Sequence, residues 1–123
     1  MNHWTGAQQQ RLLARVRKIA LALPNTSERP SHGEPCFFVN QKHTFVMCAD
    51  DHHGDGRIAL WLAAEHGAQE ILVAADPVRF FRPPYVGTRG WIGVRIDMKP
   101  DWKHITSLID EAYRVVAEAH ARR

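Results

Sequence analysis

The chain contains 123 residues, carries a net charge of +3 and has an isoelectric point near 9.2. This length is typical of one domain, so we expect a single domain over residues 1–123 with one hydrophobic core. With 45% apolar and 24% charged residues, the composition excludes an intrinsically disordered chain. The mild excess of positive charge suits a polyanionic partner, but it is also common on proteins that bind none.

The sequence has no apolar N-terminal segment of the signal-peptide kind and no apolar run long enough to span a membrane. We therefore expect a cytoplasmic monomer that does not associate with membranes. Cys36 and Cys48 lie inside apolar runs and lack the spacing of a disulfide framework or a zinc site. We expect both to be buried free thiols in the core.

The first predicted element is a helix between Thr5 and Pro24, where apolar residues recur at helical spacing. Thr5 is the expected N-cap and Pro24 the stop signal. Arg11, Arg15 and Lys18 form a basic stripe on the opposite face of this helix. Such a stripe either contacts phosphates or is simply solvated, and the pattern alone does not separate the two.

The stretch after this helix, residues 25–35, is rich in proline, glycine and small polar residues, which indicates an ordered loop or extended connection. Aromatic and β-branched residues then predict three strands, over residues 36–39, 43–49 and 57–63. The segments "NQK" and "DDHHGDG" between them are too short for a parallel crossover. The three strands are therefore expected to be antiparallel.

A short helix is predicted over residues 67–75, with Ile71, Leu72 and Ala75 as its apolar face. Residues 80–81 form an expected edge strand, because Pro83 and Pro84 cannot donate to a sheet ladder.

A strand over residues 91–97 follows, in which Ile92, Val94 and Ile96 alternate toward the core. Trp91, Gly93, Arg95 and Asp97 then lie on the opposite face, which is exposed if no helix covers it. Residues 101–121 predict the last helix, with Asp101 as its N-cap. The element order predicts an α+β domain of two layers, with a five-stranded antiparallel sheet and helices packed on one face.

Metal and catalytic motifs are weak in this sequence. Asp51 opens a segment that resembles a calcium loop, but the twelfth position, where such a loop needs glutamate, is Leu62. A polar hairpin tip explains this segment better than a transition-metal site built from His52, His53 and Asp55. We therefore expect no metal.

The histidines do not supply a catalytic motif either, since none has metalloprotease spacing or lies beside a nucleophile. His32 lies in the loop "PSHGEP" near Glu34. A structural role for this histidine is favoured over the role of a general base. We expect no catalytic centre and no cofactor.

The stretch Phe80–Asp97, "FFRPPYVGTRGWIGVRID", concentrates aromatic residues, prolines and arginines, and three interpretations compete for it. In the first interpretation the stretch is only a stiff connector between strands. In the second it is a nucleic-acid-binding surface. In the third it forms one wall of a pocket for a small anionic or peptide ligand, in which Arg89 binds a carboxylate or phosphate. In the nucleic-acid interpretation the phosphates are contacted by Arg82, Arg89 and Arg95. Tyr85 and Trp91 then stack on bases. A pocket would bring His32, Arg89 and Trp91 together. The candidate binding residues are His32, Arg82, Tyr85, Arg89, Trp91 and Arg95.

Three segments carry a resemblance to a known family: "RPSHGEPCFFVNQKHTFVM", "FFRPPYVGTRGWIGVRID" and "DWKHITSLIDEAYRVVA". Together they resemble the MmcQ/YjbR family of small bacterial proteins, over nearly the whole chain. The resemblance implies an α+β fold with a small antiparallel sheet backed by helices. Members often carry the description "DNA-binding", so the resemblance favours a nucleic-acid partner, bound weakly and without sequence preference. The "DDHHGDG" tip departs from the family pattern.

Overall fold

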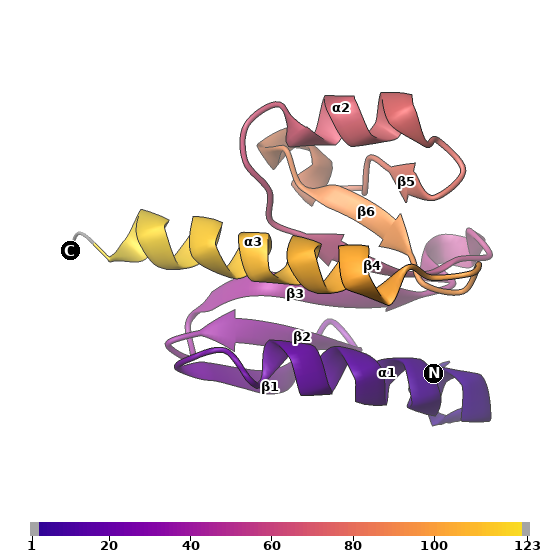
Figure 1. Ribbon diagram of the computed structural model, residues 1–123. Coiled ribbons are helices and arrows are strands. Elements are labelled where there is room, and N and C mark those ends of the chain that lie inside the picture. Colours follow the sequence, from indigo (N-terminus) through magenta and orange to yellow (C-terminus); the bar gives the residue numbers. More distant parts are fainter. Residues whose placement is uncertain (1–2, 122–123) are drawn as a thin grey trace.

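The computed structural model describes residues 3–121, and its elements alternate between helices and short strands (Figure 1). The α-helices in this range are α1 (Ala7–Ala20), α2 (Ala68–Ala75) and α3 (Trp102–His120). The strands are β1 (Thr26–Ser31), β2 (Glu34–Val39), β3 (His43–Asp50), β4 (Ile58–Leu62), β5 (Phe80–Phe81) and β6 (Ile92–Arg95). The described chain also has three short 3-10 helical turns: η1 (His3–Thr5), η2 (His52–Gly54) and η3 (Val86–Arg89). None of the described helices has the length and apolar character to cross a membrane.

The strands form one antiparallel sheet in the order β1-β2-β3-β4-β6-β5, which confirms the predicted fold class. The predicted number of five strands is wrong, because β1 adds a sixth at the edge. Its sequence, "TSERPS", lacks apolar alternation, and Pro30 pairs with Pro35 of β2. An edge strand tolerates proline because only one of its sides joins the ladder.

The β1–β2 connection is a two-residue turn formed by His32 and Gly33. Both residues have positive φ, 54° and 79°, as a tight hairpin turn of type I′ requires. The sequence "SHGE" therefore closes a hairpin where an open loop was expected, and it places His32 at the tip.

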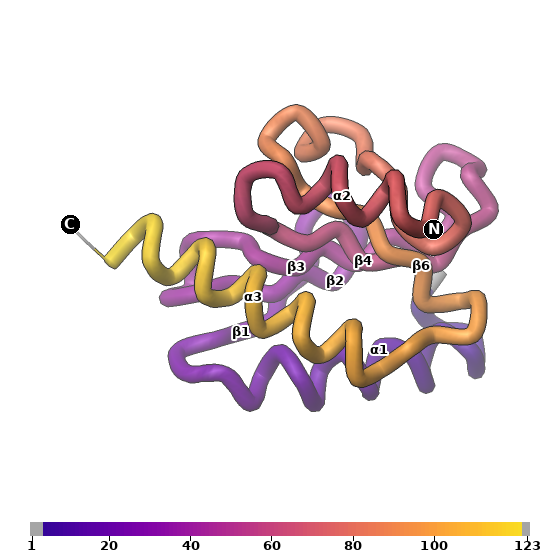
Figure 2. Tube along the Cα trace, turned by 45° about the horizontal axis from the view of Figure 1, so that its top comes forward, coloured from indigo at the N-terminus to yellow at the C-terminus, as the bar shows by residue number. Residues whose placement is uncertain are grey.

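All three helices lie on one face of the sheet, which we call the helix face (Figures 1 and 2). A row of successive strand partners crosses this face: Phe37, Val46, Leu62 and Ile92, all buried. Helices α1 and α3 lie side by side over it, and α2 contributes Ala68 and Leu72 beside α3. The predicted inward residues Ile92, Val94 and Ile96 are all buried.

The helix termini agree only partly with the sequence signals. Asp101 caps α3 as predicted, since its side chain accepts a hydrogen bond from the His104 N–H at 3.2 Å. Helix α1 begins after Gly6, so Thr5 is not its N-cap, and it ends at Ala20, before Pro24.

The predicted orientation of α2 is also wrong. Ile71 is 70% exposed, whereas the polar Gln69 is the residue of this helix that is buried. Leu72 and Val73 supply the apolar contact with the core in place of Ile71.

A second row crosses the opposite face, which no described helix covers and which we call the open face. Successive partners place Arg29, Cys36, Met47, Trp61, Gly93 and Phe81 in register across the six strands. The Phe81 ring lies directly over Gly93, because a Cβ at position 93 would be 2.4 Å from two ring carbons. Glycine is therefore required at this position by the close packing of an aromatic ring.

Substituting Gly93→Ala should destabilise the protein, because the added methyl group overlaps the Phe81 ring. Overpacking of this kind costs ~1–3 kcal/mol of unfolding free energy, measurable by urea denaturation. In a Phe81→Leu background the same substitution should cost less, since the smaller side chain leaves room. Equal costs in the two backgrounds would show that the Phe81 contact does not constrain position 93.

Candidate functional site

The open face carries a cleft of about 450 Å³. Its floor is formed by Cys36 of β2, Met47 and Ala49 of β3, and Trp61 of β4. These side chains gather there because residues that pair across neighbouring strands point to the same face of a sheet. The volume lies within the range of small-molecule sites, which are typically apolar with a few polar groups.

Two walls rise on either side of this floor. The β1–β2 hairpin contributes Ser31, His32 and Glu34. The other wall is made of His52 from η2, together with Tyr85 and Val86 from the segment between β5 and β6. The cleft thus joins five stretches of sequence, and none of them alone has a binding motif.

Tyr85 is held in an unusual backbone conformation, with φ 63° and ψ −70°. The Val86 N–H donates to the Pro84 carbonyl at 2.6 Å, which closes a three-residue γ-turn of the strained, positive-φ type. The ring that this turn projects is 70% exposed, and its hydroxyl lies 3.2 Å from His53 Nε2. Strain of this kind concentrates at functional positions, so Tyr85 is the part of the wall that most needs a functional explanation.

A buried glutamine anchors segment 82–91. Gln69 of α2 is 4% exposed, and its Nε2 donates to the carbonyl oxygens of Gly87 at 2.9 Å and Trp91 at 2.6 Å. These two bonds tie the loop to α2; the Gly87 carbonyl also accepts a hydrogen bond from the Gly90 N–H at 3.1 Å. Gln69 was not among the residues predicted to matter for the site. The indication in the sequence was a polar residue within a short, mostly apolar helix.

Glu34 is the acidic member of the cleft wall. Its Oε1 accepts a hydrogen bond from the Trp4 indole N–H at 2.5 Å, and its Oε2 accepts from the Asp50 backbone N–H at 3.2 Å. Both donors are neutral, so the carboxylate keeps its negative charge uncompensated by these two partners. Sequence reasoning noted Glu34 only as a neighbour of His32.

Some of the predicted binding residues line the cleft and others lie outside it. His32 and Tyr85 line the cleft, whereas Arg89 and Trp91 do not, so the expected convergence of His32, Arg89 and Trp91 does not occur. Trp91 is 4% exposed and belongs to the core, with the Arg89 guanidinium 5.2 Å from its ring centroid. A ring buried to this extent offers no face for a base to stack on, which corrects the role expected for Trp91.

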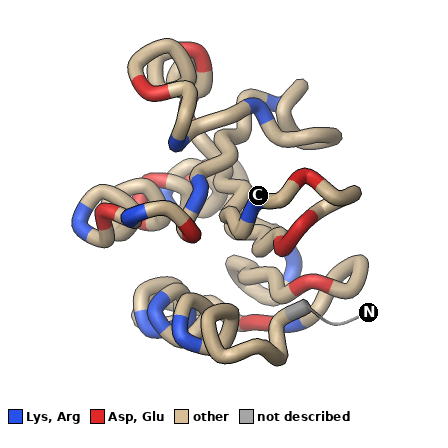
Figure 3. The backbone as a smooth tube through the Cα atoms, turned by 90° about the vertical axis from the view of Figure 1, so that its right-hand side faces the viewer, with Lys and Arg blue, Asp and Glu red and all other residues tan. Residues whose placement is uncertain are grey.

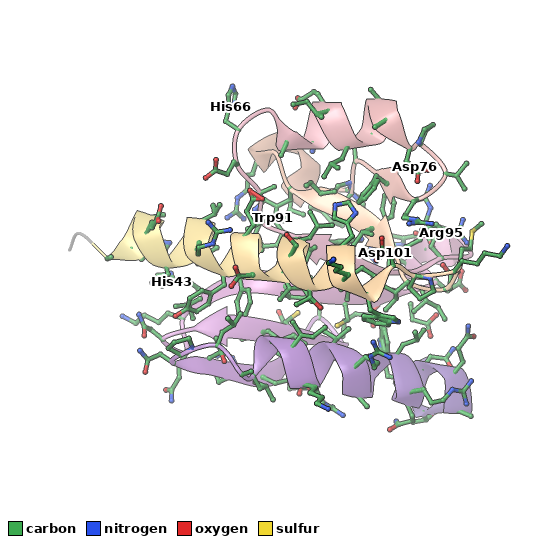
Figure 4. The ribbon with its side chains drawn as sticks, viewed as in Figure 1. His43, His66, Asp76, Trp91, Arg95 and Asp101 are labelled. Carbon is green, nitrogen blue, oxygen red and sulfur yellow. The ribbon has the colours of Figure 1, made fainter. Side chains whose placement is uncertain are left out.

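Arg95 lies at the end of β6 opposite Trp91 (Figure 4) and binds Asp97 through two hydrogen bonds of 3.1 and 3.0 Å. Burial is the largest single influence and disfavours the Asp97 carboxylate, but the hydrogen bonds and charge of Arg95, together with backbone hydrogen bonds, outweigh burial and lower the pKa of Asp97. Arg95 is therefore already paired with an acid. Arg82 and Arg89 are exposed.

Two polar atoms at the cleft are buried without a protein partner. Trp61 Nε1 and His52 Nε2 are inaccessible to water and form no hydrogen bond among the described residues. The two rings meet edge to face with centroids 4.9 Å apart. Each unpaired buried group calls for an explanation, because burial without a bond costs free energy.

The hairpin tip uses its acidic residues to fix its own backbone. Asp51 accepts a hydrogen bond from the Gly56 N–H at 2.8 Å, and Asp55 accepts one from the Arg57 N–H at 2.9 Å. In residues 3–121, no group of three or more His, Cys, Asp or Glu side chains is placed to hold a metal ion.

Both cysteines are free and buried, as predicted. Burial raises the pKa of Cys36 to about 11, with a further increase from the Glu34 carboxylate. Burial also raises the pKa of Cys48. Thiols held protonated in this way are poor nucleophiles.

Comparison with known proteins identifies related folds and sequences. The family model described as YjbR matches residues 21–115. The crystal structure of the Deinococcus radiodurans protein DR2400, with the family-model domain DUF419, superposes with a TM-score of 0.73 at 18% sequence identity. The likeness covers 86% of this chain and 78% of that chain, and at this identity it shows the fold alone. No curated protein matches the chain.

The raised thiol pKa predicts a loss of stability in alkali. The folded protein holds the Cys36 proton more tightly than the unfolded chain, so stability falls as pH rises from the ordinary thiol value of 9.0 toward about 11. Denaturation curves should show wild type losing more stability over this window than Cys36→Ala. Below this window the difference between the two proteins should be constant. Parallel losses throughout would mean that Cys36 does not titrate with a raised pKa.

Proposed function

The chain belongs to the YjbR family, and from this premise we propose that it is a binding protein whose site is the open-face cleft, which holds a small and largely apolar ligand. The observation that carries the proposal is the cleft itself. Met47, Ala49 and Trp61 give it an apolar floor, and a strained turn holds Tyr85 at its mouth. A strained aromatic wall over an apolar floor is more than a connector between two strands requires.

Binding without catalysis is the form of this proposal that the chemistry of the cleft supports. The thiol at the floor, Cys36, has a pKa raised to about 11, so it is protonated near neutral pH. The carboxylate of Glu34 accepts bonds from two N–H groups, which orient it as a fixed charge. The floor is otherwise apolar and supplies shape in place of reactive groups.

Tyr85→Ala tests this proposal because it removes a wall of the cleft without touching the core. Fragment screening by protein-observed NMR should find ligands that shift the resonances of Met47 and Trp61. Their dissociation constants should rise roughly three- to tenfold in the variant, the cost of losing an aromatic contact.

Ile71→Ala is the matched control, since Ile71 is also 70% exposed but lies on α2, outside the cleft. It should leave the affinity unchanged. Equal effects of the two substitutions, or fragments that shift only resonances away from the open face, would contradict the assignment of the cleft.

Nucleic-acid binding is the second candidate, favoured by the exposed arginines that flank Tyr85. Arg82 and Arg89 lie on the same short segment as this 70% exposed aromatic ring. A further basic surface lies on α1, the lowest helix in Figure 3, where Arg11, Arg15 and Lys18 are exposed. This candidate uses phosphate contacts and one stacking ring, so binding would be weak and independent of sequence.

A salt titration tests this second candidate. Two phosphate contacts, from Arg82 and Arg89, predict that log affinity falls with log salt with a slope of about −1.8. Arg89→Ala should reduce the magnitude of this slope by ~0.9, as measured by fluorescence anisotropy with labelled single- and double-stranded oligonucleotides. Arg114→Ala is the control, since Arg114 pairs with Asp110 on α3. Absence of binding at low salt, or equal slopes for wild type and Arg89→Ala, would remove this candidate.

A further inference from the structure

The charge of the cleft follows from its lining. Glu34 is the one residue among the described lining side chains with a fixed charge at neutral pH, and His32 and His52 are the titratable groups beside it. The Glu34 carboxylate accepts bonds from two neutral N–H groups, and none of the Lys or Arg side chains in residues 3–121 forms an ion pair with it. Each carboxylate oxygen also retains acceptor capacity, because it has two lone pairs and only one of these bonds.

The arginines on the open face are occupied elsewhere. Arg29 lies over the Phe38 ring at 3.7 Å and donates to the Gln41 carbonyl. Arg57 lies over the Phe81 ring at 4.0 Å, beside Asp55, and Arg95 binds Asp97. None of these three arginines lines the cleft, and each has a partner elsewhere, so Glu34 is the charged residue of its wall.

The pKa of the Cys36 thiol, at the floor of the cleft, depends on the charged groups that lie near it. After burial, the Glu34 carboxylate is the largest influence on the pKa of Cys36, and it raises this pKa. The Arg29 guanidinium lowers the same pKa by a smaller amount. At this thiol the effect of the Glu34 carboxylate therefore exceeds that of the Arg29 guanidinium.

Besides Glu34, the cleft is lined by aromatic rings that carry polar groups. Trp61, Tyr85 and His52 form one cluster, with His52 meeting the other two rings edge to face at 4.9 and 5.9 Å. The faces of indole and phenol rings attract cations through their quadrupoles, and the attraction grows when the site is shielded from water.

Resting on the proposed function, we infer that the ligand of this cleft is a small organic cation, an ammonium group on a flat apolar body. The Glu34 carboxylate and the Trp61 and Tyr85 rings select the charge, and Met47 and Ala49 contact the apolar body. The same arrangement disfavours the carboxylate or phosphate ligand that Arg89 was expected to grip, because Arg89 lies outside the cleft.

Three probes of nearly equal size and different charge test this inference: benzylammonium, benzyl alcohol and benzoate. Their affinities for the full chain are measured by NMR titration at fixed pH and ionic strength, following Met47 and the Trp61 indole N–H. Benzylammonium should bind roughly fivefold more tightly than benzyl alcohol, the middle of the range for a cation on aromatic faces. Benzoate should bind most weakly.

Glu34→Gln separates charge from shape, because the amide retains a similar outline and can still accept one of the two hydrogen bonds. In this variant benzylammonium should lose the part of its advantage that Glu34 provides and keep the part that the Trp61 and Tyr85 rings provide, while benzyl alcohol binds as before. Glu65→Gln is the matched control, since Glu65 is an exposed carboxylate outside the cleft. If Glu34→Gln does not fold, the ranking of the three probes on wild type still decides the inference.

The outcomes distinguish the two levels of the proposal. Equal affinities for benzylammonium and benzyl alcohol, or tightest binding of benzoate, would overturn the cationic ligand and leave the cleft as a binding site. Failure of all three probes to shift the Met47 and Trp61 resonances would overturn both. An advantage for benzylammonium that is undiminished in Glu34→Gln would show that Glu34 does not select the charge.

Discussion

The two hydrogen bonds from the buried Gln69 side chain are the constraint on which the open face depends. The three helices cover only the helix face, so the aromatic and apolar side chains on the other face need a different cover. Segment 82–91 supplies part of it, and Gln69 fixes this segment by satisfying the Gly87 and Trp91 carbonyls. Since a buried glutamine is costly without partners, the helix and the segment must be positioned together.

The cleft is a consequence of how far this cover extends. Within segment 82–91 Trp91 is buried, and just before this segment the Phe81 ring packs on Gly93. Over β2 and β3 the sheet remains uncovered between Tyr85 and the β1–β2 turn, and this uncovered part is the floor of the cleft. The strained turn at Tyr85 then places an aromatic ring at the boundary between the covered and the open part. The packing of the open face and the proposed binding thus depend on the same segment, which carries both the buried Trp91 and the exposed Tyr85.

Charge separates the two candidate surfaces of this protein. The exposed arginines, Arg82 and Arg89, lie outside the cleft, while the cleft itself has the negative Glu34 in its wall. A polyanion and a small cation would therefore be recognised by different residues, with Tyr85 the one side chain available to both. The net charge of +3 describes the whole molecule and does not predict the charge of the residues that line one cleft.

Local sequence signals were sufficient for the elements that local physics controls. Apolar alternation predicted the inward side of β6, Asp101 predicted the start of α3, and short connections predicted an antiparallel sheet. The segment between residues 80 and 97 was also recognised from its composition, and the family resemblance from its motifs. These features depend on neighbouring residues along the chain, which is what periodicity and turn chemistry report.

Tertiary structure alone decided the rest. Strand β1 is polar and forms only because β2 offers it a partner, and Ile71 is exposed because Gln69 rotates α2 toward the loop. The burial of Trp91 depends on what covers the open face. The cleft combines residues of the first four strands and their turns with residues of the segment between β5 and β6. Their convergence is set by strand order and register, so no window of the sequence contains it.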